Sequence, residues 1–177
     1  MFAALVFLLL LASSQAQDAN SIANFLYYNF GNLIPMNELV QIENAVAQQA
    51  CGGATTQQII DNFSNTVQQN IGGQTAANLL AVGSKLQNDL GNDYNAVKDA
   101  TGRVGVQVLT PVLNDCAQQC SNGVSAFLAQ ANNYATTQFV QDYLNQIYQA
   151  VIGVNQNDWG ICRNDLVQHI YFGNYGY

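Results

Sequence analysis

The chain has 177 residues, of which 49% are hydrophobic and only 8% are charged, and its formal net charge is −7 at pH 7. Four Lys and Arg side chains are too few to neutralise a run of phosphates, which excludes nucleic acid as a partner and disfavours an anionic membrane surface. Polarity comes instead from 43 Gln and Asn residues, whose amides are hydrated without repelling one another strongly.

The first residues have the pattern of a secretory signal peptide. An unbroken apolar run over 2–11 precedes Ser14, Gln15 and Ala16, which place small residues where signal peptidase cleaves. This run is too short to cross a bilayer, and no later run is long enough to do so. We therefore expect a signal peptide over 1–16, a single helical-bundle domain over 17–177, and a secreted, extracellular product with no membrane span.

Apolar residues recur at helical spacing through the first half of the mature chain. They predict helices over 22–30, 36–50, 55–71 and 76–90. Thr55 or Thr56 can cap the third of these. The apolar face of the fourth is predicted to hold Ala76, Leu79, Leu80, Leu86 and Leu90. The polar, turn-rich stretch 91–102 predicts a loop with a frayed helical turn.

The longest apolar ridge runs from Val104 to Ala135. Pro111 would either kink this helix or mark its start, and the Ser-Asn-Gly sequence at 121–123 is a second break. Because the apolar phase continues through both points, we predict one bent helix or two nearly collinear helices rather than a hairpin. Two further helices follow, the first opened by Thr136-Thr137 and the second capped by Asn157 or Asp158. The predicted fold is all-α, a disulfide-bonded bundle of about six helices around a long central helix.

Four cysteines in a secreted chain indicate two disulfides. Cys116 and Cys120 are four residues apart on the ridge, where their Cβ atoms lie farther apart than the roughly 3.5–4.5 Å of a disulfide. We therefore predict that Cys51 and Cys162 each pair with one of these two thiols, in either order. A metal site with Cys116, Cys120 and His169 as ligands is the alternative, which a single His and oxidising conditions disfavour.

No arrangement of residues points to catalysis. His169 is the only histidine and would have to serve any Ser–His or Cys–His catalyst, but the chain has no Gly-x-Ser-x-Gly turn. Glu38, Glu43 and the scattered Asp residues form no evident acid/base pair. The Gly pairs at 52–53 and 72–73 end helices and lack the Lys-Ser/Thr of a phosphate loop. We predict no enzyme activity, no cofactor and no metal.

Asn62 begins the sequence Asn62-Phe63-Ser64, which is an acceptor for N-glycosylation in a secreted protein. It lies about 100° around the third helix from Phe63, toward the outer edge of that helix. We predict that Asn62 is a glycosylation site.

Two functional classes fit these observations. A structural or self-associating component of an extracellular material is favoured by the amide-rich, low-charge surface and by the Tyr- and Gly-rich end of the chain. An extracellular carrier of a lipid-like or other apolar ligand is favoured by abundant Phe, Tyr and Leu in a bundle that could enclose a cavity. The corresponding partners are other copies of the chain or other extracellular matrix proteins in the first case, and an apolar small molecule in the second.

Two short segments add a family resemblance. The chain resembles the amino-terminal helical-bundle domain of spider silk proteins in two segments, Ala126-Phe127-Leu128 and then Phe139-Val140-Gln141-Asp142 ahead of an apolar helix. Its signal peptide and its low charge are further points of resemblance. The chain differs from that family in its four cysteines and in an extra segment near 90–120. The resemblance implies the structural, self-associating class, and it assigns no functional residue.

Glu43 is the one charged residue in the apolar stripe of the second predicted helix, between Val40, Val46 and Ala47. At the edge of the stripe its carboxylate would reach water through its methylenes. Held among apolar groups, it would have a raised pKa, because burial disfavours the charged form. Folding would then become less favourable as the pH rises through the unfolded and then the folded pKa. Glu43 is therefore a candidate pH-sensitive residue.

We predict that Glu43→Gln raises the melting temperature near neutral pH and has progressively less effect toward acid. The measurement is thermal unfolding of both proteins between about pH 4 and 7.5, a range set by the ordinary Glu pKa of about 4.3 and an upward shift. An equal effect at every pH would show that the carboxylate is solvated.

Overall fold

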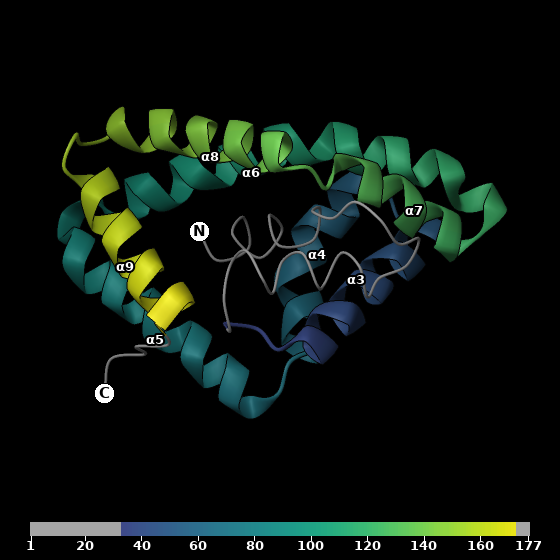
Figure 1. The fold of residues 1–177 in the computed structure, drawn as a ribbon, viewed down its shortest axis with the longest axis horizontal. Helices are drawn as coiled ribbons and strands as arrows, with labels where there is room; N and C mark the ends of the chain where they lie inside the picture. Colours follow the sequence, from purple (N-terminus) through teal and green to yellow (C-terminus); the bar gives the residue numbers. More distant parts are fainter. Residues whose placement is uncertain (1–32, 173–177) are drawn as a thin grey trace.

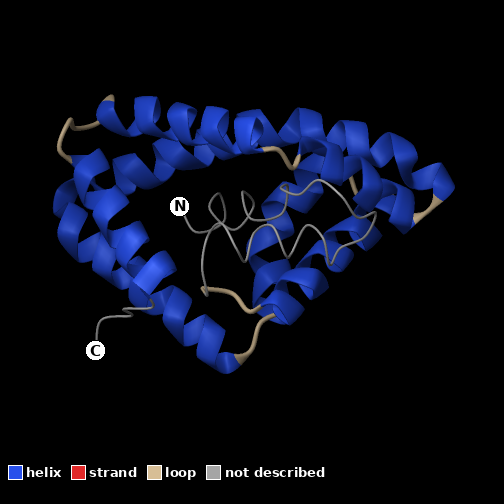
Figure 2. Cartoon of the chain, in the orientation of Figure 1, coloured by secondary structure: helices blue, strands red, loops and turns tan. Residues whose placement is uncertain are grey.

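The computed structural model describes residues 33–172, apart from the side chains of residue 137 and of 169–172. The predicted signal peptide and the predicted helix over 22–30 lie outside the described residues. The described chain is all-helical and contains no strand (Figures 1 and 2). Its elements are α3 (Met36–Cys51), α4 (Thr56–Gln69), α5 (Gly73–Leu90), the 3-10 helix η1 (Gly91–Asp93), α6 (Tyr94–Ala117), the 3-10 helix η2 (Gln118–Asn122), α7 (Val124–Tyr134), α8 (Thr137–Ile152) and α9 (Asp158–Phe172).

The helices lie along three sides of a roughly triangular molecule (Figure 1). One side is formed by α6 with α8 beside it, and a second by α5 with α9 packed against it. On the remaining side α3 packs against α4 and α7. Among residues 33–172, none of the helices combines the length and the apolarity needed to cross a bilayer.

Local signals in the sequence fix several helix ends. Thr55 forms a capping box with Gln58: its hydroxyl accepts from the Gln58 N–H at 3.2 Å, and the Gln58 side chain accepts from the Thr55 N–H at 2.8 Å. Thr136 caps α8 by accepting from the Phe139 N–H at 3.1 Å. Gly91, between α5 and α6, has a backbone φ of 53°, a value that residues other than Gly rarely adopt. Of the two predicted candidates for the cap of α4, Thr55 takes the position, and the predicted start of a helix at Thr136-Thr137 is confirmed with Thr136 as its cap.

Two clusters of buried side chains form the core. The first core cluster lies among α3, α4, α6, α7 and the first turns of α8, and it includes Ile42, Phe63, Leu113 and Phe127. The second lies among α5, α6, α8 and α9 and includes Val82, Leu86, Val97, Tyr143 and Val151. Helix α6 belongs to both, because its first turns reach the second cluster and its last turns reach the first. The prediction of an all-α bundle around a long central helix is confirmed, and that helix is α6.

The prediction of a loop over 91–102 is wrong, because α6 begins at Tyr94 and continues through this stretch. Its buried residues there are Val97, Ala100 and Thr101, and the Thr101 hydroxyl donates to the Val97 carbonyl at 3.0 Å. Only Val97 among these three is a sizeable apolar residue, so the helical spacing of apolar residues is weak here and is hidden among polar neighbours. Pro111 lies inside α6 and does not mark its start.

The prediction of collinear helices over 104–135 is also wrong, because α6 and α7 form a hairpin. The Asp115 carboxylate accepts from the Tyr134 hydroxyl at 2.7 Å, whereas collinear helices would separate these residues by about 28 Å. The chain reverses at η2 and at Gly123, which has a φ of 96°. Both arms of the hairpin face the same core cluster, so the apolar phase is kept although the direction changes.

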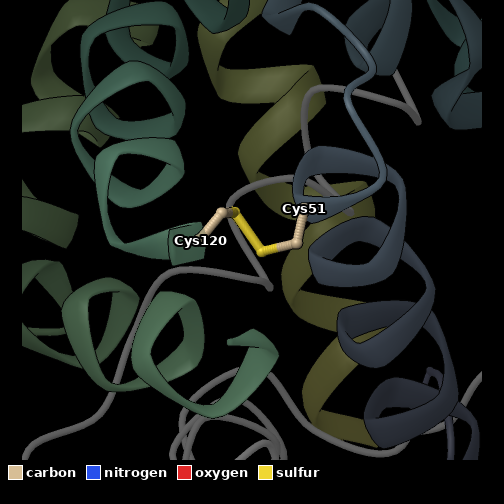
Figure 3. Close-up of a disulfide and its surroundings, with 2 residues drawn as sticks. All are labelled: Cys51 and Cys120. Atoms are coloured by element: carbon tan, nitrogen blue, oxygen red, sulfur yellow. A yellow bond between two sulfur atoms is a disulfide. The ribbon is translucent and has the colours of Figure 1, made fainter. Parts of the chain in front are cut away.

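One of the two predicted disulfides is present. Cys51, the last residue of α3, is bonded to Cys120 in η2, with their Cα atoms 4.9 Å apart (Figure 3). The bond joins residues 69 apart in the sequence, which corresponds to about 4 kcal/mol of stabilisation by chain entropy. It fixes the end of α3 to the turn of the α6–α7 hairpin.

The second predicted disulfide is wrong: Cys116 and Cys162 are free thiols. Their positions explain why, since Cys116 is buried in the first core cluster and Cys162, on α9, is buried in the second. Burial raises the pKa of both thiols to about 12, and nearby carboxylates add to the shift: Asp115 for Cys116, and Asp158 and Asp165 for Cys162. Neither thiol is poised to react in the folded protein.

We predict that iodoacetamide leaves the native protein unmodified near pH 8 and adds two carbamidomethyl groups after unfolding without a reductant. Burial removes both access and thiolate character in the folded state, and unfolding restores them. Mass spectrometry of the intact protein counts the adducts, and peptide mapping places them on Cys116 and Cys162. Absence of adducts from the unfolded protein would show a second disulfide and contradict the structure.

Candidate functional site

A surface groove lies between α4 and α5 and ends at the first residue of α6. Its volume is about 480 Å³. The apolar part of its lining comes from the last turns of α4, the connection after it and the first turns of α5: Val67, Ile71, Ala76, Leu79 and Leu80. The remaining lining residues are Ser64, Gln68, Gly83, Ser84, Gln87 and Tyr94. The site is therefore an apolar surface surrounded by hydroxyl and amide groups.

The groove exists because α4 and α5 pack in different directions. Helix α4 directs Phe63 and Val67 into the first core cluster, whereas α5 directs Val82 and Leu86 into the second. Leu79 is the residue between them, packed against both clusters. The two helices are adjacent in the chain, yet their facing sides leave the groove open at the seam between the clusters.

Leu80 is the most exposed large hydrophobic residue in the described part of the chain, at 72% of its full surface. The apolar pattern of the sequence assigns Leu80 to the buried face of the helix over 76–90, and that assignment is wrong. Val82, fully buried, takes the inner position instead, because Val82, Leu86 and Leu90 follow the helical spacing toward α8 and α9. Adjacent residues are about 100° apart on a helix, so the leucines at 79 and 80 could both have faced the core, and the sequence gives no clear signal that Leu80 is exposed.

The residues singled out from the sequence do not line this groove. Glu43, on α3, is buried with 3% of its surface exposed, so it does not lie at the edge of its apolar stripe. Its pH sensitivity stays a prediction. Asn62 is exposed on α4 and accepts a hydrogen bond from Asn65 at 2.9 Å, and its glycosylation likewise stays a prediction.

The alternative metal site is not assembled by the described residues. Cys120 is bonded to Cys51 and offers no thiolate, and the side chain of His169 is outside the description. No group of three or more His, Cys, Asp or Glu side chains with the spacing of a metal site occurs among the residues described.

A cluster of charged side chains joins α5 to α9 on the side of α5 away from the groove. We call this cluster, which consists of Lys85, Asp89 and Asp165, the acidic interface. Lys85 and Asp89 of α5 form an ion pair at 2.6 Å, and Lys85 is also 3.4 Å from Asp165 of α9. Burial raises the pKa of Asp165, and the hydrogen bond and negative charge of Asp89 raise it further, while Lys85 opposes the shift. The pair of carboxyls therefore favours retaining a proton.

The first turn of α9 repeats this pattern. Asp158, its first residue, is buried, and burial followed by the charge of Asp93 raises its pKa. Asp93 itself accepts a hydrogen bond from Asn155 at 3.0 Å. At both ends of the contact between α9 and the α5–α6 corner, burial thus raises the pKa of a carboxyl group.

Comparison of the chain with known protein families, with curated proteins and with solved structures finds no match. The resemblance to spider silk domains stays a prediction, carried by segments that fall in α7 and α8. The functional proposal therefore rests on the geometry and charge of the described residues.

We predict that Asp165→Asn stabilises the protein near pH 7 and has no effect near pH 3. The folded pKa of Asp165 is raised above the unfolded value of about 3.9, so its contribution to stability is full below that value and is lost as the pH rises through the folded value. The amide can still donate to Asp89, which keeps its ion pair with Lys85. A melting temperature higher by about 2 °C at pH 7 is expected.

The matched control is Asp99→Asn, which removes one exposed carboxylate from α6 and changes the net charge equally. It should leave the melting temperature nearly unchanged at both pH values. A loss of stability in Asp165→Asn at pH 7 would show that the attraction of Lys85 outweighs burial.

Proposed function

We propose that this protein is an extracellular carrier of a small apolar ligand, held in the groove between α4 and α5. The observation that carries the proposal is an open apolar groove of about 480 Å³. Ligand pockets in proteins enclose about 300–1,000 Å³, with mostly apolar walls and a few polar groups. The lining of this groove has that composition.

The energetic argument rests on Leu80. Leaving a leucine largely exposed forgoes most of the roughly 1.5–3 kcal/mol that its full burial would contribute. An apolar ligand lying between Leu79 and Leu80 removes this surface from water together with that of Ile71 and Ala76. The groove is thus a place where binding gains free energy that folding leaves unused.

An extracellular location is supported by three observations of different kinds. The apolar run and cleavage pattern of the first residues are those of a signal peptide. The Cys51–Cys120 disulfide is of a kind that persists in oxidising compartments. The described helices offer no candidate membrane span.

Self-association into an extracellular material is the second candidate, and the surface composition favours it. The 43 amides of the chain are hydrated without strong mutual repulsion, so contacts between copies can form wherever amides rather than the few charged residues meet. Leu80 and Val106 are the exposed large hydrophobic residues of the described chain, and contact between copies would cover them. This candidate places the partner on the outside of α5 and α6.

We predict that the purified protein binds the uncharged dye Nile red with one saturable site per monomer, and that Ser84→Trp weakens binding at least about tenfold, or about 1.4 kcal/mol. Ser84 is exposed and lines the groove, so the indole occupies the ligand's place without disturbing the core. Ser125→Trp on α7 is the control, since Ser125 is exposed and outside the lining. Fluorescence titration gives the affinities.

Sedimentation at several concentrations separates the two candidates. A monomer at all concentrations, with dye binding that only Ser84→Trp weakens, supports the carrier. Oligomers that grow with concentration, without a saturable dye site on the monomer, would overturn the carrier proposal in favour of self-association. Native mass spectrometry of protein secreted by its producing cells adds an independent measurement, because a carrier retains a lipid-sized ligand.

A further inference from the structure

The lining of the groove restricts the class of ligand, an inference that rests on the proposed carrier function. None of the eleven lining residues is charged. Their polar groups are the hydroxyls of Ser64, Ser84 and Tyr94 and the amides of Gln68 and Gln87. Each of these groups both donates and accepts hydrogen bonds. A hydroxyl, ester or amide on the ligand matches them, whereas a full charge finds no opposite charge.

The cations of α5 and α6 are Lys85, Lys98 and Arg103, and none of them lines the groove. Lys85 follows Ser84 in α5 but points to the acidic interface, where Asp89 and Asp165 lie 2.6 and 3.4 Å from its Nζ atom. Lys98 lies one turn after Tyr94 in α6, and Asp61 lies about one turn before Ser64 in α4. Both are exposed, they have opposite charges, and neither lines the groove.

The net charge of the protein also disfavours the binding of an anionic ligand. At −7 the chain repels a carboxylate at long range, and desolvating that carboxylate without a partner costs additional free energy. A cation would be attracted at long range, but it too would lose its hydration in a lining without carboxylates. Only an uncharged head group avoids both penalties.

The length of the groove sets the size of the ligand. Its lining on α5 runs from Ala76 to Gln87, which is about 16 Å at 1.5 Å per residue, the length of an extended chain of about twelve carbons. On α5 the apolar residues lie toward Ala76, and Ser84 and Gln87 lie toward the other end with Tyr94 of α6, while Ser64 and Gln68 add polar groups from α4. This polarity orients a ligand with an apolar chain and one polar end.

We infer that the groove binds an uncharged amphiphile, a medium-length alkyl chain with a hydroxyl, ester or amide head group, in preference to fatty-acid anions and alkyl cations. The head group lies among Ser84, Gln87 and Tyr94, and the chain lies along Leu79 and Leu80.

The test compares three probes with one chain length: dodecanol, dodecanoate and dodecyltrimethylammonium, each below its aggregation concentration at neutral pH. Each probe displaces Nile red from the wild-type protein. Dodecanol is expected to do so at concentrations at least about tenfold lower than either ion, with an affinity that does not change with salt. Ser84→Trp should lose dodecanol binding, and Lys98→Gln should leave it unchanged.

Two results would overturn the inference and can be told apart. If dodecanoate or the ammonium probe binds as tightly as dodecanol, the carrier function stands and the restriction to uncharged ligands is wrong. A dodecanoate affinity that falls in Lys98→Gln would then assign the counter-ion to Lys98. If Nile red and all three probes fail to bind, the proposed function itself fails.

Discussion

The structure depends on α6, a long helix that is shared by two separate core clusters. Its first turns contribute Val97 to the second cluster, and its last turns contribute Leu113 and Cys116 to the first. Helix α8 shares this role, because its first turn contributes Val140 to the first cluster and its later turns contribute Tyr143 and Val151 to the second. Each of the other described α-helices contributes buried side chains to one cluster, so α6 and α8 together join the two halves. The Cys51–Cys120 disulfide reinforces only the half formed by α3, α6 and α7.

The groove follows from this division. Helices α4 and α5 are joined by a short connection, but each buries its apolar face in a different core cluster. Their facing sides therefore cannot close on each other without withdrawing Phe63 or Leu86 from a core. The cost of such a withdrawal is several kcal/mol, more than the gain from covering Leu80. The lower-energy arrangement therefore keeps both core clusters intact and leaves an apolar groove open between α4 and α5.

The sequence predicts the helices better than it predicts their directions. Strong apolar periods and capping residues, such as Thr55 and Thr136, locate the helices well because both signals are local. The helix over 94–102 escapes prediction because it buries small residues. The hairpin at Gly123 escapes because an apolar phase is the same for a helix that continues and for one that folds back. The disulfide partners depend on which core each thiol enters, and that is a property of the whole fold.

The candidate site is harder to predict for the same reason. Its residues are individually ordinary, and only the divergence of α4 and α5 brings Ser64 and Ser84 to one groove. Leu80 was visible in the sequence as one of two adjacent leucines, but the periodicity alone did not say which of the pair faces outward.

The few charges of the chain have an uneven distribution that links stability to pH. Glu43, Asp158 and Asp165 are buried although the chain has few charged residues and 43 uncharged amides. For Asp158 and Asp165 burial raises the pKa, so both make folding less favourable as the pH rises through their unfolded and then their folded values. Both lie on α9, and α5, against which α9 packs, also forms one wall of the groove on its other side. Helix α5 therefore stands between the buried carboxyls of α9 and the groove, and the two sites share no residue.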